Sequence, residues 1–174
     1  MPQLQDPNFK RAVVQLIDHD ERGTFGLVLN READLTAGAL CESLEMAWNG
    51  DPSARIHWGG PVQANTGWVL FADDIAYPVE RDETQQVLPG LSFAGSLSVL
   101  QAVAEHPPAE VRLFLGYAGW GPGQLESEIA AGAWLFAPPS VDAVFRTEPD
   151  SLWEHVVRGL GIDPATLVST AGVH

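Results

Sequence analysis

The chain has 174 residues, of which 45% are apolar and 18% charged, a composition that excludes a disordered chain and indicates a globular domain. Nine lysines and arginines stand against 23 aspartates and glutamates, so the formal net charge is −14. This charge opposes direct binding to nucleic acid, because affinity for that polyanion comes largely from basic side chains. The length predicts one domain over residues 1–174.

The compartment is predicted from three further features. No apolar run approaches the ~18–20 residues that a membrane span needs, and residues 1–7 lack the basic and apolar regions of a secretory signal. Cys41 is the only cysteine, which excludes an internal disulfide and a multi-cysteine metal cluster. We therefore expect a cytoplasmic protein with no cofactor and no membrane association.

Hydrophobic periodicity and capping residues predict the elements in chain order. They are strands over 9–17 and 24–30, a helix over 34–47, strands over 55–58 and 67–72, a helix over 97–105, a strand over 111–117, a helix over 124–131, strands over 133–137 and 141–145, and a helix over 150–160. Residues 73–90 are expected to be mainly connection with one short strand, and Asp163 to begin a last helical turn. Because strands come in adjacent pairs as often as they alternate with helices, the pattern favours an α+β fold with a largely antiparallel sheet.

The first candidate for a catalytic or metal-binding site is Asp18-His19-Asp20-Glu21, in the predicted connection between the first two strands. Carboxylates beside an imidazole can bind a divalent metal or act as an acid–base pair. Consecutive residues point in different directions, however, and aspartate is common in turns for conformational reasons. The favoured interpretation is therefore a polar hairpin loop.

A glycine-rich passage from Leu115 to Glu128 leads from a strand into a helix, which is the layout of a phosphate-binding loop. No lysine follows the glycines, and Glu126 and Glu128 near the start of the helix would repel a phosphate. We interpret the glycines as permitting tight turns around Trp120. That tryptophan is predicted to lie in a loop, where it is a candidate for exposed recognition.

Two other reactive residue types have structural interpretations. Because neighbouring residues of a strand face opposite sides, either His57 or Trp58 should face the core, and His57 is interpreted as structural and not as a ligand. Cys41, on a predicted helix, is interpreted as a small buried apolar residue. The sequence lacks the G-x-S-x-G motif that is typical of serine hydrolases.

Four stretches, taken together, resemble the YqgE/AlgH family of bacterial proteins. They are residues 1–11, residues 19–23 with 26–31, residues 59–62 with 67–70, and residues 115–126 (LGYAGWGPGQLE) with Glu128, Trp134 and Leu135. The resemblance implies a bifurcated, largely antiparallel sheet, part of which closes into a small barrel, with helices around it. Functionally the family is largely uncharacterised; one branch is called a transcriptional regulator of alginate synthesis.

The chain also departs from the family pattern. The family often has Cys-Glu-His where this chain has Ile17, Asp18 and His19, so a thiol-based role at that position would be absent. After Gly60-Pro61 the family usually has Asp-Arg-Gly-Phe-Val-Leu-His, whereas this chain has an asparagine, a threonine and Phe71 at the Asp, Arg and His positions. A family site that required those three polar residues would be absent or altered here.

The first functional hypothesis is a non-enzymatic interaction or regulatory protein that acts through another protein. A second is a small-molecule- or metal-binding enzyme with a site near His19, Asp20 and Glu126, and a third, disfavoured by charge, is a direct DNA-binding regulator. No catalytic or metal-ligating residue is assigned. The candidate interaction or ligand surface comprises His19, Asp20, Asn30, Arg31, Gly59, Gly60, Tyr117, Trp120, Gln124 and Glu126.

Overall fold

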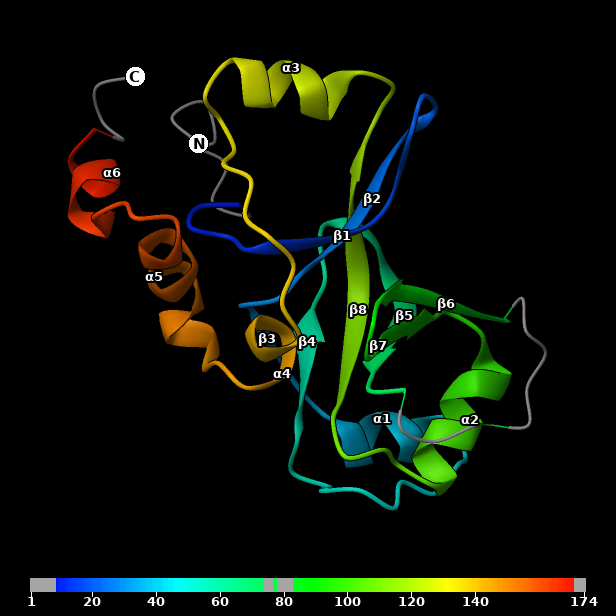
Figure 1. The fold of residues 1–174 in the computed structure, drawn as a ribbon. Helices are drawn as coiled ribbons and strands as arrows, with labels where there is room; N and C mark the ends of the chain where they lie inside the picture. The colour runs from blue at the N-terminus through cyan, green and yellow to red at the C-terminus, as the bar shows by residue number, and fades with distance from the viewer. Residues whose placement is uncertain (1–8, 74–76, 78–82, 171–174) are drawn as a thin grey trace.

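The computed structural model describes residues 9–73, 77 and 83–170, and it combines one sheet with surrounding helices (Figure 1). The strands are β1 (Val14–Asp20), β2 (Gly23–Val28), β3 (Glu32–Thr36), β4 (Arg55–Trp58), β5 (Val62–Phe71), β6 (Thr84–Leu88), β7 (Leu91–Ala94) and β8 (Val111–Trp120). The helices are α1 (Ala37–Ser43), α2 (Leu97–Glu105), α3 (Gln124–Ala130), α4 (Val141–Phe145), α5 (Pro149–Gly159) and α6 (Pro164–Thr170). Among the residues described, no helix has the length and apolarity to cross a bilayer.

The sheet divides at β8, its long central strand. Its main path runs β1-β2-β8-β5-β7-β6, and β3 and β4 form a branch that also joins β8. Residues 118–120 of β8 pair with β2, whereas Phe114 and Leu115 pair with β4. The β4–β8 pairing is parallel and the other pairings are antiparallel. The expected bifurcated, largely antiparallel sheet is therefore confirmed.

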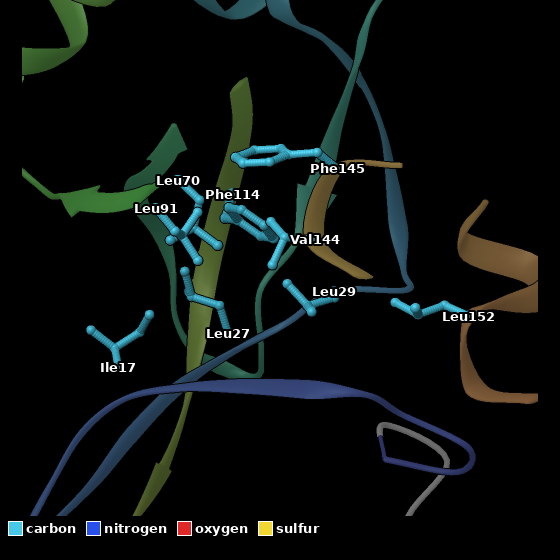
Figure 2. Packing of buried hydrophobic residues seen from close by; sticks show 9 residues of the cluster. All are labelled: Ile17, Leu27, Leu29, Leu70, Leu91, Phe114, Val144, Phe145 and Leu152. Carbon is cyan, nitrogen blue, oxygen red and sulfur yellow. The ribbon is translucent and has the colours of Figure 1, made fainter. Parts of the chain in front are cut away.

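The main path of the sheet curls into a nearly closed barrel, in which the first and last strands approach each other. Gln85 on β6 donates from Nε2 to the carbonyl of Ile17 (3.1 Å) and to Oδ1 of Asp18 (3.0 Å), both on β1. Apolar side chains from β1, β2, β5, β7 and β8, from the residue after β2 and from the C-terminal helices form one buried cluster against the sheet (Figure 2). They are Ile17, Leu27, Leu29, Leu70, Leu91, Phe114, Val144, Phe145 and Leu152.

The outer faces of the sheet are covered at two places. Helix α2 packs Val99 and Val103 against Val69 and Leu113, and α1 contributes to the same cluster. At the far end of β8, Leu125 of α3 packs with Ala118 and Trp120. Helices α1 and α2 therefore lie at one end of β8 and α3 at the other (Figure 1).

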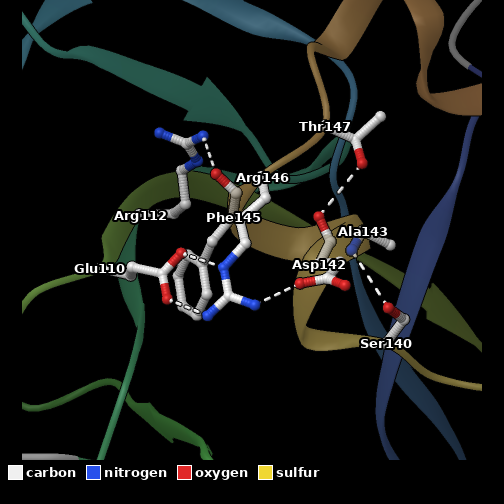
Figure 3. A network of polar contacts seen from close by, with 8 residues as sticks. All are labelled: Glu110, Arg112, Ser140, Asp142, Ala143, Phe145, Arg146 and Thr147. Carbon is white, nitrogen blue, oxygen red and sulfur yellow. Dashed lines mark hydrogen bonds and ion pairs between the residues drawn. The ribbon is translucent and has the colours of Figure 1, made fainter.

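Helix α4 is attached to the start of β8 by two arginines (Figure 3). Arg112 donates from Nη2 to the carbonyl of Phe145 (3.0 Å). Arg146 donates to both carboxylate oxygens of Glu110 (3.0 and 2.7 Å) and also to Asp142. These contacts fix α4 against the start of β8. Val144 and Phe145 of the same helix belong to the buried apolar cluster and hold the helix in place as well.

Several predicted elements are confirmed, including the helices over 97–105 and 150–160 and the central strand that begins at Val111. Others were wrong. Residues 141–145 form α4, because the Ser140 hydroxyl caps the Ala143 N–H (3.3 Å). Residues 133–137 form no strand within the part that the structure describes.

Three further differences concern boundaries. Strand β1 continues to Asp20, so the expected polar connection over 18–23 is reduced to a tight turn. The predicted helix over 34–47 is replaced by β3 and a shorter α1 that begins after Thr36, whose hydroxyl accepts from the Ala39 N–H. Of the predicted connection over 73–90, residues 84–88 form β6 as expected, and residues 74–76 and 78–82 lie outside the described residues.

Candidate functional site

Three side chains meet where the β1–β2 hairpin contacts α3. His19 Nε2 lies 3.1 Å from Glu126 Oε1, and His19 Nδ1 lies 2.6 Å from the Thr24 hydroxyl. His19 and Glu126 are separated by more than a hundred residues, and they meet because β2 pairs with the end of β8, which leads into α3. The structure thus brings together two of the three residues of the second hypothesis, His19 and Glu126, and adds Thr24, which sequence reasoning missed.

The Thr24 hydroxyl, the His19 imidazole and the Glu126 carboxylate form a hydrogen-bonded series, which can fix the ring nitrogen of His19 that carries the proton. In the neutral tautomer with its proton on Nε2, His19 donates to Glu126 and accepts from the Thr24 hydroxyl. Thr24 is 7% exposed, so its hydroxyl is poorly placed to attack a substrate. Both ring nitrogens are occupied, and the side chains of His19 and Glu126 are about half exposed (47% and 53%). The arrangement acts chiefly as a polar contact between the hairpin and α3.

Asp20 does not join this group. Its carboxylate accepts from the main-chain N–H of Arg22 (2.8 Å) and from the Arg22 guanidinium (3.2 Å). These bonds, the main-chain one first, hold the pKa of Asp20 below its usual value. The residue therefore stabilises the hairpin turn, in agreement with the interpretation of Asp18–Glu21 as polar hairpin residues. Among the residues described, no three His, Cys, Asp or Glu side chains gather into a group that could hold a metal ion.

Asn30 and Arg31 hold the segment that precedes β1. Asn30 is 8% exposed; its Oδ1 accepts from the Val13 N–H (2.9 Å) and its Nδ2 donates to the Arg11 carbonyl (2.8 Å). Arg31 donates to the carbonyl of Lys10, and burial lowers the pKa of its guanidinium. Both residues are committed to main-chain groups of their own chain, so they belong to the scaffold and not to an open surface.

Replacing Asn30 with alanine is expected to lower the free energy of unfolding by about 2–3 kcal/mol, because it leaves two main-chain groups without their partner. Denaturation by urea measures this loss. Asn49→Ala is the matched control, since Asn49 is exposed and makes one side-chain bond, to the Glu105 carbonyl (2.7 Å). An equal loss in the two variants would contradict the scaffold role.

The two glycines of the candidate surface are needed for close packing of the backbone. A Cβ on Gly59 would lie 2.3 Å from the carbonyl oxygen of Gly116, and one on Gly60 would lie 2.1 Å from the main chain of Tyr117. Gly59 also joins the two branches of the sheet, since it accepts from the Val28 N–H and donates to the Leu115 carbonyl (both 2.8 Å). They position β8 and do not bind through side chains.

The half-buried aromatic side chain of Tyr117 belongs to a cluster in the barrel. Its ring is stacked on Phe25 (centroids 4.7 Å apart), and Trp68 stacks on Phe93 (5.4 Å). A cavity of about 370 Å³ opens beside Phe93. It is lined by Glu83, Thr84, Gln85, Phe93, Ala94, Gly95 and Ser96, and none of these residues belongs to the candidate surface.

Trp120 is buried, and the expectation of an exposed recognition residue in a loop was wrong. It is the last residue of β8 and 7% exposed. Its ring packs against Phe9 and Trp134, with centroids 6.3 and 5.7 Å away. Gln124, which follows in α3, accepts the Gly121 N–H through its side chain (2.9 Å) and so closes the turn after the strand. The residues proposed as one interaction surface therefore lie in separate parts of the structure.

The other structural interpretations hold. His57 is 3% exposed and packs on Phe114, whereas Trp58 is half-buried, so His57 is the residue that faces the core. Cys41 is fully buried, and burial raises the pKa of its thiol. Neither residue lies at a surface where it could meet a ligand.

Sequence reasoning missed the exposed apolar side chains that follow α3. Leu135 is 52% exposed and Phe136 is 64% exposed, and they are neighbours in the segment between α3 and α4. The signal that could have indicated them is the apolar run Ala133–Ala137, which was predicted as a strand. A strand that finds no partner in its own chain leaves such side chains uncovered.

The fold defines an α+β protein built on a bifurcated, largely antiparallel sheet that curls into a nearly closed barrel. The AlgH-like family model matches residues 1–165, and the chain belongs to this family. A UPF0301 protein of Myxococcus xanthus is 45% identical over 100% of this chain and 94% of its own. A second, from Ruegeria pomeroyi, is 39% identical over 99% of this chain and 94% of its own.

Solved structures agree with this assignment. The solution structure of the AlgH protein from Pseudomonas aeruginosa has a TM-score of 0.76 and 34% sequence identity; the match covers 97% of this chain and 88% of that one. A crystal structure from Corynebacterium diphtheriae has a TM-score of 0.70 and 25% identity, with coverage of 91% and 82%.

Proposed function

We propose that this protein is a non-enzymatic interaction protein of the cytoplasm, which binds another protein through the exposed segment that follows α3. The observation that carries the proposal is the adjacent pair Leu135 and Phe136, which are 52% and 64% exposed. Large apolar side chains that neighbour each other at the surface are typical of binding sites, whereas single ones are common anywhere. Aromatic side chains in particular tend to dominate binding energy.

The charge of the chain supports a protein partner and opposes nucleic acid. With a net charge of −14, direct contact with DNA would be unfavourable. Any effect on transcription would therefore be exerted through the partner. The proposal also accounts for the polar contact between His19 and Glu126, which helps to hold α3, and thus the start of the exposed segment, against the hairpin.

The expected result is that replacing both Leu135 and Phe136 with serine lowers capture of a specific partner by about tenfold or more, as for truncated binding hot spots. Immobilised wild type and variant are compared by quantitative mass spectrometry of proteins retained from a bacterial lysate. Because both side chains are exposed, the free energy of unfolding of the double variant should differ from that of the wild type by no more than about 0.5 kcal/mol.

Leu97→Ser is the matched control, since Leu97 is 61% exposed but lies at the start of α2, at the other end of β8. It should leave capture of the same partner unchanged. If both variants lose the same proteins, capture reflects general stickiness of apolar side chains. If neither loses any, the proposed binding segment is wrong.

A further inference from the structure

The segment between α3 and α4 has the sequence of a strand but pairs with no strand among the residues that the structure describes. It runs extended between the two helices (Figure 1). Ala133 donates to the Glu128 carbonyl at the end of α3. Beyond it, no hydrogen bond found among the described residues uses the main chain of residues 134–139. Main-chain groups of this kind are a template for an added strand.

The segment is nevertheless anchored on one side. The Trp134 ring packs against Phe9 and Trp120, with centroids 5.8 and 5.7 Å away. Its indole N–H donates to Glu128 Oε1 (3.1 Å). Leu135 and Phe136 follow at once and are large apolar side chains that are 52% and 64% exposed. A fixed extended backbone with exposed side chains requires little ordering when a second strand binds.

The stretch of sequence that contains this segment is acidic, whereas the basic residues Lys10 and Arg11 follow Phe9, which packs on Trp134. Between Leu113 and Phe145 there is no lysine, arginine or histidine, and the acidic residues are Glu126, Glu128 and Asp142. Glu126 contacts His19 and Asp142 pairs with Arg146. Glu128 receives only the neutral Trp134 N–H among its described side-chain contacts. The carboxylate next to the exposed segment is therefore the one available to a basic group.

We propose that residues 134–137 are a docking strand for an extended segment of a partner protein, with apolar side chains that cover Leu135 and Phe136 and a lysine or arginine that meets Glu128. This inference rests on the proposed function and adds the class of partner. Pro138 and Pro139 have no N–H, so they end the pairing on that side. A second copy of this chain fits less well, because two chains of charge −14 repel each other.

The test is selection of a random twelve-residue peptide library on the full chain, followed by binding measurements with the selected peptides. Because Leu135 and Phe136 are neighbours and face opposite sides of a strand, we expect extended peptides with apolar residues at adjacent positions and a lysine or arginine at one end. Their affinity should fall at least about tenfold in the Leu135→Ser, Phe136→Ser double variant and stay unchanged in Leu97→Ser. Glu128→Gln should weaken binding up to about fivefold, and only at low salt.

Hydrogen exchange supplies a readout of main-chain pairing. On binding, alternate amides of the segment, either Leu135 and Ala137 or Phe136, should become protected, and N-methylation of alternate amides in the peptide should abolish binding. Selected peptides that bind through Leu135 and Phe136 but are acidic or helical would overturn this inference and leave the proposed function intact. Failure to select any peptide that depends on these residues, or self-association of the wild type that the double variant loses, would overturn the docking strand itself.

Discussion

Replacing Trp120 with alanine is expected to lower the free energy of unfolding by about 3–5 kcal/mol, the usual loss when a buried tryptophan is truncated. The side chain is 7% exposed and packs with Phe9, Trp134 and Leu125 between β8 and α3. Because the cavity would lie under α3, the variant should lose protection there before it unfolds globally. Urea denaturation with hydrogen exchange measures both effects.

Two further variants make this prediction specific. Trp120→Phe keeps part of the ring contact and should lose clearly less stability than the alanine variant. Leu97→Ala removes an exposed side chain and should change stability by no more than about 0.5 kcal/mol. If Trp120→Ala were as stable as Leu97→Ala, the tryptophan would be exposed in solution, as the sequence alone suggested.

The second large effect is a loss of stability in acid through His57. Burial first, and then the positive charge of Arg112, lower the pKa of His57 from 6.5 to about 4, although a hydrogen bond with the main chain of Arg55 acts in the opposite direction. The folded state therefore favours the neutral ring, which also has a buried Nδ1 without a partner among the residues described. Protonation would place a second cation near Arg112, which holds the carbonyl of Phe145.

The direction of this pH effect follows from the linkage between proton binding and folding. Above pH 6.5 the ring is neutral in both states, so His57 imposes no cost. As the pH falls from 6.5 to about 4, the unfolded chain binds a proton that the folded chain does not, and stability decreases. Since one pKa unit corresponds to about 1.4 kcal/mol, the loss reaches about 3 kcal/mol near pH 4.

Urea denaturation of wild type and His57→Leu at pH 7 and pH 4.5 tests this prediction. The lowered pKa of Asp20 also costs stability in acid, but mainly below its usual value of 3.8 and therefore outside this pH range. The variant should lose about 2–3 kcal/mol less than the wild type over this range. His155→Gln, at an exposed position on α5, should follow the wild type. Equal losses in wild type and His57→Leu would show that His57 is not held neutral.

Local signals predicted the elements that depend on neighbours in sequence. Ser96 begins α2, as expected, because its hydroxyl can accept the Val99 N–H wherever the helix lies. The periodic apolar side chains of residues 150–160 predicted α5 for the same reason. The apolar run that starts at Val111 indicated a buried central strand, and β8 is that strand. The family resemblance supplied the bifurcation and the barrel.

The candidate site was predicted only in part, because burial and pairing depend on contacts between distant segments. His19 and Glu126 were proposed together, but their 3.1 Å contact requires the pairing of β2 with β8. Trp120, between glycines, has no local signal for burial, and Phe9 and Trp134 cover it only in the fold. Asn30 is polar in sequence but has its partners 17 and 19 residues away.

The amino-acid sequence by itself determined the acidic charge, the α+β class, the family and the helices whose caps and apolar faces are local. Only the tertiary structure decided which residues are covered. Residues 133–137 have the side chains of a strand, yet strand formation needs a partner, and none pairs with them within the described chain. Residues 141–145 have similar side chains but form α4, because Ser140 caps them and Phe145 joins the buried apolar cluster. Two similar apolar runs thus differ in outcome because long-range packing, and not local preference, determines where each is buried.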